Sequence, residues 1–74
     1  MDVTGYSIRP SKHFILTWMR KWDMTIESLK LLLETAHKVE KVGKKKYESY
    51  TNIKGKSKKL IFIKFKEKNT INIL

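Results

Sequence analysis

The sequence has 74 residues, and its 17 lysine and arginine residues outnumber its seven aspartate and glutamate residues, which gives a formal net charge of +10. This length predicts one domain over residues 1–74, because domains rarely contain fewer than about 50 residues. The chain contains no cysteine, which excludes disulfides, thiolate metal sites and thiol nucleophiles. Its two histidines are 24 residues apart and too few for a zinc site, so we expect no metal and no cofactor.

The first half of the chain predicts a short strand followed by two amphipathic helices. The strand covers residues 5–9 and ends at Pro10, and Ser11 is placed to cap the first helix. Thr25 is placed to cap the second helix, which ends near residue 37. The predicted apolar faces are Ile15, Trp18, Met19 and Trp22 for the first helix, and Ile26, Leu29, Leu32, Leu33 and Ala36 for the second.

The two tryptophans of the first helix are either part of the core or part of a binding surface. Trp18 and Trp22 are four residues apart and therefore share one helix face. Large aromatic side chains are usually buried, so we expect both in the core or between the helices. Exposure of either one would instead mark a surface for a partner, since tryptophan is enriched at binding hot spots.

In the second half, the period of the apolar residues changes from that of a helix to that of a strand. We predict strands over 47–53, 60–66 and 70–74, with an optional short strand before Gly43. Within 60–66, the odd-numbered residues point to one face, and the even-numbered residues, with Lys64 and Lys66 among them, to the other. The predicted fold is an α+β domain of β-α-α-β-β-β order, with two helices on one face of a three- to five-stranded antiparallel sheet.

Nearly all of the excess positive charge lies in the second half. Residues 1–37 carry a net charge of +1, whereas residues 38–74 carry twelve lysines against three glutamates, a net charge of +9. A field summed over so many cations indicates a polyanion, such as nucleic acid, as the partner. For each single lysine the alternative is a solvated loop, as in proteins from AT-rich or hot-environment genomes.

The lysines concentrate in two neighbouring loops, 43–46 and 54–59, and on one strand face. Tyr47 and Tyr50 lie between the loops as candidate surfaces for base stacking. Because lysine is a mobile point charge, we expect contacts to the phosphate backbone and low sequence specificity. The candidate nucleic-acid-binding residues are Lys44, Lys45, Lys46, Lys54, Lys56, Lys58, Lys59, Lys66, Tyr50 and Arg20.

Three segments carry a resemblance to a known family. They are Ser11-Lys12-His13-Phe14 at the first helix, Asp23-Met24-Thr25 between the helices, and Gly43-Lys44-Lys45-Lys46-Tyr47 ahead of a strand. With the element order of the whole chain, they resemble a compact branch of the RelE/ParE-like toxins with an N-terminal Ser-x-His motif. The resemblance implies a RelE-like fold, endoribonuclease activity on RNA or ribosome-bound mRNA, and an acidic antitoxin that covers the basic surface. The chain departs from that branch at Thr17, where the branch usually has an arginine, and at Asp23, where it has a glycine. A second arginine of the branch, before the turn, is replaced by Lys21 or Trp22, with one residue inserted.

Cleavage of RNA by internal attack needs a base for the 2′-hydroxyl, cations for the phosphorane and an acid for the leaving oxygen. His13 is the natural titrating candidate, because an imidazole changes its charge near neutral pH. Lys64 and Lys66, crowded by like charges, are candidate bases, and Tyr47 and Tyr50 are candidates to position the base. Of these we select Lys64 and Tyr47. A lone histidine at a helix start more often caps or packs, which is the alternative for His13.

Three hypotheses follow for the function. They are a toxin-like mRNA endoribonuclease regulated by an antitoxin, a non-catalytic nucleic-acid-binding module, which the missing arginines favour, and an interaction protein that docks an acidic partner. The apolar runs are too short to span a bilayer and no signal peptide is visible, so we expect a cytoplasmic protein without membrane contact. The small core of so short a chain makes a homodimer a reasonable expectation.

Overall fold

The computed structural model describes residues 1–53 and 55–74 and confirms the α+β fold class. Two helical segments precede most of the sheet, and the first of them runs without a break through three short pieces, α1, η1 and α2. The elements are β1 (Ser7–Pro10), α1 (Lys12–Phe14), η1 (Ile15–Met19), α2 (Arg20–Trp22), α3 (Ile26–Glu34), β2 (Lys38–Lys41), β3 (Lys46–Ile53), β4 (Lys56–Phe65) and β5 (Thr70–Ile73).

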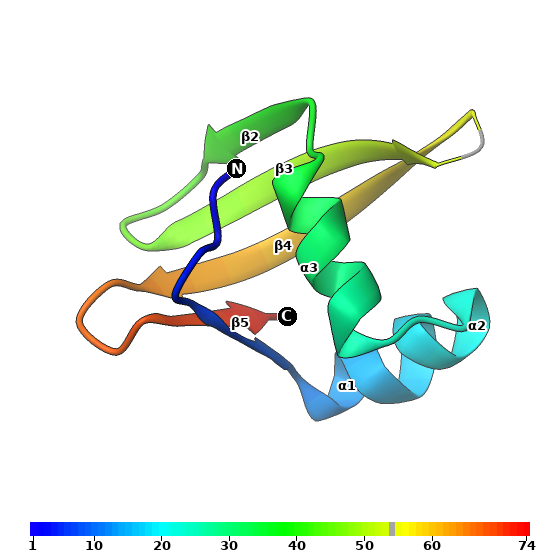
Figure 1. Ribbon diagram of the computed structural model, residues 1–74, viewed down its shortest axis with the longest axis horizontal. Helices are drawn as coiled ribbons and strands as arrows, with labels where there is room; N and C mark the ends of the chain where they lie inside the picture. Colours follow the sequence, from blue (N-terminus) through cyan, green and yellow to red (C-terminus); the bar gives the residue numbers. More distant parts are fainter. Residues whose placement is uncertain (54) are drawn as a thin grey trace.

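The five strands form one sheet in the order β1-β5-β4-β3-β2 (Figure 1). Strands β2 to β5 pair with their neighbours in antiparallel fashion, as predicted. The pairing of β1 with β5 is parallel, which the expectation of a purely antiparallel sheet did not include. The optional strand before Gly43 is present as β2, so the order is β-α-α-β-β-β-β.

Both predicted helix caps are confirmed. The backbone N–H of Phe14 donates to Ser11 Oγ at 3.1 Å, and the N–H of Ser28 donates to Thr25 Oγ1 at 3.2 Å. Between the helices, Asp23 adopts a left-handed conformation with φ of 51°. Aspartate tolerates this region better than most residues, so the turn forms without a glycine.

The apolar face predicted for the first helix is confirmed only in part, and the middle turn of the helix is a π-helix. Residues Ile15–Met19 form η1, and the N–H of Met24 donates to the carbonyl of Met19, five residues back, at 2.9 Å. Met19 and Trp22 pack half-buried against the core as predicted, but Ile15 and Trp18 are exposed and Phe14 is buried instead. A helical pattern of period 3.6 could not predict this shift.

The core lies between the helices and one face of the sheet. Helix α3 lies over the sheet (Figure 1), and Thr51 Oγ1 of β3 donates to the Leu32 carbonyl at 2.9 Å. In α3 the predicted stripe is confirmed at Leu29, Leu32 and Leu33 but is wrong at Ile26, which is exposed. The buried apolar residues are Val3, Phe14, Leu29, Leu32, Leu33, Leu60, Phe62, Ile71 and Ile73.

The alternation predicted for β4 decides which of its side chains lies under the helices. Leu60 and Phe62 are buried on the helix-covered face, and Lys64 continues that face at the end of the strand. The odd-numbered residues from Ile61 to Phe65 therefore line the open face, where they are half-buried. Within the described residues, no helix is long and apolar enough to cross a membrane.

Candidate nucleic-acid interface

The two lysine-rich loops lie at opposite ends of the sheet rather than side by side. Residues 43–45 precede β3 and residue 55 follows it, so the eight residues of β3 separate the two loops. At about 3.3 Å per residue this is roughly 26 Å. Positive charge therefore gathers in two regions, each with its own geometry, and not on one continuous loop surface. Lys54, one of the predicted binding residues, lies outside the described residues.

The first region is a small pocket at the β2–β3 turn, with a volume of about 190 Å³. The N–H groups of Val42 and Gly43 both donate to the Lys46 carbonyl, at 2.9 and 3.2 Å, and close the turn. The N–H of Lys64 donates to the Lys45 carbonyl at 2.9 Å and fastens the turn to β4. We call this site the lysine pocket; it is lined by Lys41, Lys44, Lys45, Tyr47, Lys64, Lys66 and Glu67.

The charge of the lysine pocket is strongly unbalanced. Its carboxylate, Glu67, lies 3.8 Å from Lys45 Nζ, and both side chains are more than half exposed, so the ion pair is weak. In the described part of the chain, the other four lysines of the pocket form no ion pair. Lys64 Nζ instead lies 5.2 Å from the centre of the Tyr6 ring. These ammonium groups create a local positive field that favours a polyanion.

The three catalytic candidates do not come together. Tyr47 and Lys64 both line the lysine pocket, where the Tyr47 ring stacks on Phe62 with centroids 5.5 Å apart. His13 is exposed in α1, beyond Pro10, which pairs with Ile73. In Figure 1, α1 lies near the bottom of the view, away from the β2–β3 turn at the left. The lysine pocket therefore contains Tyr47 and Lys64, but it does not contain His13, the third predicted catalytic residue.

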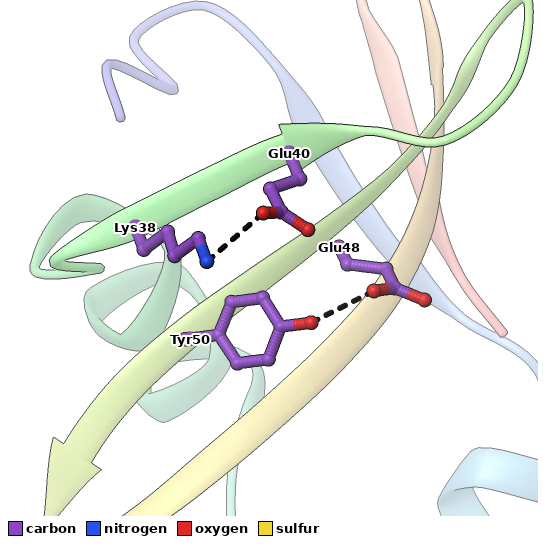
Figure 2. Close-up of polar contacts among 4 residues, drawn as sticks. All are labelled: Lys38, Glu40, Glu48 and Tyr50. Atoms are coloured by element: carbon purple, nitrogen blue, oxygen red, sulfur yellow. Dashed lines mark hydrogen bonds and ion pairs between the residues drawn. The ribbon is translucent and has the colours of Figure 1, made fainter.

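Tyr50 and Tyr47 lie on opposite faces of β3, so they do not form one stacking surface. The Tyr50 hydroxyl donates to Glu48 Oε1 at 2.8 Å, and Lys38 Nζ lies 2.9 Å from Glu40 Oε1 (Figure 2). The hydrogen bond to Glu48 and, to a smaller extent, burial raise the pKa of Tyr50. Lys59 Nζ, 3.8 Å from Glu48 Oε2, completes a network in which Lys38 and Lys59 are each paired with a glutamate on the open face.

The second region is a larger cleft of about 570 Å³ between the first helix and the start of β4. Trp18 and Trp22 lie side by side in it, with ring centroids 5.1 Å apart. Three of its lysines, Lys56, Lys58 and Lys59, are among the predicted binding residues. Lys21, which the first helix brings to the cleft, is not among them. We call this site the tryptophan cleft; it is lined by Phe14, Trp18, Lys21, Trp22, Lys56, Ser57, Lys58, Lys59, Ile61 and Leu74.

Besides Tyr50, two predicted binding residues belong to neither region. Arg20 is exposed on α2 and does not line the cleft, although Lys21 beside it does. Lys46 is exposed at the start of β3, where it pairs with Ile63 and faces the open side of the sheet. Both contribute to the overall positive field without sharing a pocket with the other lysines.

A scan against protein-family models, a search of the curated proteins and a search of the solved structures each find no match to this chain. Its function is therefore argued from the two basic regions themselves.

Proposed function

We propose that this protein binds single-stranded nucleic acid, with RNA as the ligand that the toxin resemblance favours, and that it holds the phosphate backbone. The observation that carries the proposal is the lysine pocket, in which five lysines face one carboxylate. Each phosphate that a lysine neutralises releases condensed counterions, so the binding free energy comes mainly from charge. Ammonium groups do not read base edges in the bidentate manner of arginine, so the binding has low sequence specificity.

The test compares two double variants that remove the same charge. Lys44→Gln/Lys66→Gln removes two cations from the lysine pocket, whereas Lys12→Gln/Lys30→Gln removes two exposed cations that do not line it. Fluorescence anisotropy with a labelled 12-nucleotide RNA measures the affinity at several salt concentrations. The pocket variant should lower the slope of log affinity against log salt by about 1.4, since each lost phosphate contact removes about 0.7 on a single strand.

The control variant should change that slope much less. Equal effects of the two variants would show that the net charge alone attracts RNA and that the pocket is not the binding site. Strong competition by polyglutamate at matched charge, with weak competition by unlabelled RNA, would favour an acidic protein such as an antitoxin as the partner.

A toxin-like mRNA endoribonuclease is the second candidate, favoured by the presence of Tyr47 and Lys64 in one basic pocket. Such an enzyme would use the cations for the phosphorane charge and the pocket residues for proton transfer. The test is incubation of the purified protein with ribosomes and mRNA, followed by mapping of the cuts. If this candidate holds, Lys64→Gln and Tyr47→Phe should abolish cleavage and His13→Ala should not. Intact mRNA would contradict the endoribonuclease hypothesis and would leave non-catalytic binding as the proposed function.

A further inference from the structure

The tryptophan cleft combines aromatic rings with cations, which the lysine pocket does not do to the same degree. Trp22 is half-buried, packs edge-on against Phe14 at 6.3 Å, and carries Lys58 Nζ 4.4 Å from its ring centre. Trp18, at the outer end of this row, is 36% exposed. Exposure of either tryptophan is expected to mark a surface for a partner, and Trp18 meets that condition.

The charged side chains that line the cleft all have the same sign. Lys21, Lys56, Lys58 and Lys59 line it, and among the described residues that line it there is no aspartate or glutamate. Lys59 is paired with Glu48 on the open face, while Lys21 Nζ lies 5.4 Å from the Trp18 ring centre. A ligand complementary to this cleft is therefore flat and apolar in one part and anionic in another.

We propose that the tryptophan cleft is a base-stacking subsite for single-stranded RNA. One unpaired base stacks on the exposed Trp18 ring, and the phosphates on either side of that base contact Lys21 and Lys56. Aromatic side chains bind bases of any sequence in this way, because every base has a π face. The inference rests on the proposed nucleic-acid binding and adds to it a second site, of different chemistry, on the opposite end of β4.

Local structure supports this use of the first helix. The π-helical turn η1 brings Phe14, Trp18 and Trp22, spaced by four residues, into one row beside β4. Such turns are rare and occur frequently at functional sites. Trp18 is exposed, whereas Phe14 is buried and Trp22 is half-buried against the core, so the stacking ring is held on a packed support.

The experiment uses the full chain, a 12-nucleotide RNA, an abasic strand of the same length and UMP as probes. Intrinsic tryptophan fluorescence reports stacking, and anisotropy reports affinity. Trp18→Ala should weaken binding of the RNA by about 5- to 150-fold, the range for the loss of one base stack. Trp18→Tyr should retain most of the affinity, since it keeps an aromatic face. Leu16→Ala, at a residue 53% exposed on the same helix, should have no effect.

Two further comparisons separate stacking from charge. The abasic strand should bind wild type and Trp18→Ala equally, because it offers no base to Trp18. Lys21→Gln should weaken RNA binding more than Lys30→Gln, which removes the same charge from α3, outside the cleft. Circular dichroism on each variant shows that the fold is retained, and Lys21→Gln tests the cleft without removing an aromatic ring.

The outcomes distinguish this inference from the proposed function. Normal RNA affinity and quenching in Trp18→Ala would overturn the stacking subsite and leave RNA binding intact. Failure of wild type to bind any RNA would overturn both. If UMP quenches the tryptophan fluorescence as strongly as RNA does, the cleft is a nucleotide site and a free nucleotide is its ligand. Quenching by polyglutamate that requires Trp18 would overturn the proposal in favour of a protein partner.

Discussion

The lysine pocket and the tryptophan cleft are both positive, but they differ in what lies beside the charge. In the lysine pocket the Tyr47 ring is stacked on Phe62 within the protein, so the ligand meets ammonium groups. In the tryptophan cleft Trp18 is exposed, and four lysines line the same cleft. The first environment suits phosphates alone, and the second suits a base with its phosphates.

The difference has a structural origin in β4, the strand that both regions share. Lys58 and Lys64 point to the same helix-covered face of β4 but stand at its two ends, with the buried Leu60 and Phe62 between them. Six residues along a strand correspond to about 20 Å. Polar side chains are thus confined to the ends of the strand, and the core separates the two binding regions.

Truncation of the shared core should have the largest effect, because it removes both regions at once. Phe62 is fully buried and supports the Tyr47 ring, so Phe62→Ala should lower the free energy of unfolding by about 3–5 kcal/mol. Urea denaturation followed by circular dichroism measures this loss. Phe65→Ala, on the open face and half-buried, is the control and should cost clearly less. Similar losses for the two variants would contradict the assignment of the two faces.

Salt should distinguish the two regions more selectively. If four lysines of the lysine pocket contact phosphates, raising the salt from 50 to 200 mM should weaken RNA binding by about 50-fold. Trp18→Ala should keep this salt dependence while lowering the affinity at every salt concentration, because stacking releases few ions. Anisotropy titrations of both proteins measure the two slopes. A slope that falls in Trp18→Ala would mean that the cleft, and not the pocket, holds most of the phosphates.

Local sequence signals predicted the elements but not the way in which the two regions assemble. Ser11 and Thr25 act within one helical turn, so their caps could be predicted from neighbouring residues alone. The placement of Tyr47 and Tyr50 on opposite faces also follows from their odd spacing in a strand, although the sequence interpretation treated them together. The separation of the loops likewise follows from the length of the strand between them.

The tryptophan cleft could not be predicted in the same way. Its members come from the first helix, from the start of β4 and from Leu74, and only the tertiary arrangement brings them together. The π-helical turn that contains Trp18 has no sequence signature at the level of apolar periodicity. Lys21 was therefore counted with the balanced first half of the chain, although it lies in a positive cleft.

A smaller effect is expected at Asp23, which joins the first helix to α3 next to the tryptophan cleft. Its φ of 51° is favourable for glycine, so Asp23→Gly should raise the free energy of unfolding by about 0.5 kcal/mol. Asp23→Asn is the matched control, since it removes the same charge and keeps a side chain. Thermal melts of both variants measure the difference. Destabilisation by glycine and by asparagine alike would show that the carboxylate, and not the backbone conformation, determines the residue at this turn.

The smallest effect is expected at high pH, on the open face between the two regions. The pKa of Tyr50 is raised in the folded protein by its hydrogen bond to Glu48. A raised pKa means that the folded state holds the proton more tightly than the unfolded state does. The stabilisation is therefore complete below the ordinary tyrosine pKa of 10.0 and is lost as the pH rises through the folded value.

Tyr50→Phe should accordingly lose less stability than wild type between neutral and strongly alkaline pH. Urea denaturation over this range measures the two profiles, and Tyr6→Phe, which lies beside Lys64 rather than a carboxylate, is the comparison. RNA binding of Tyr50→Phe at neutral pH should equal that of wild type, since Tyr50 lines neither the lysine pocket nor the tryptophan cleft. Weakened binding in this variant would place the nucleic acid on the open face of the sheet and would merge the two regions into one surface.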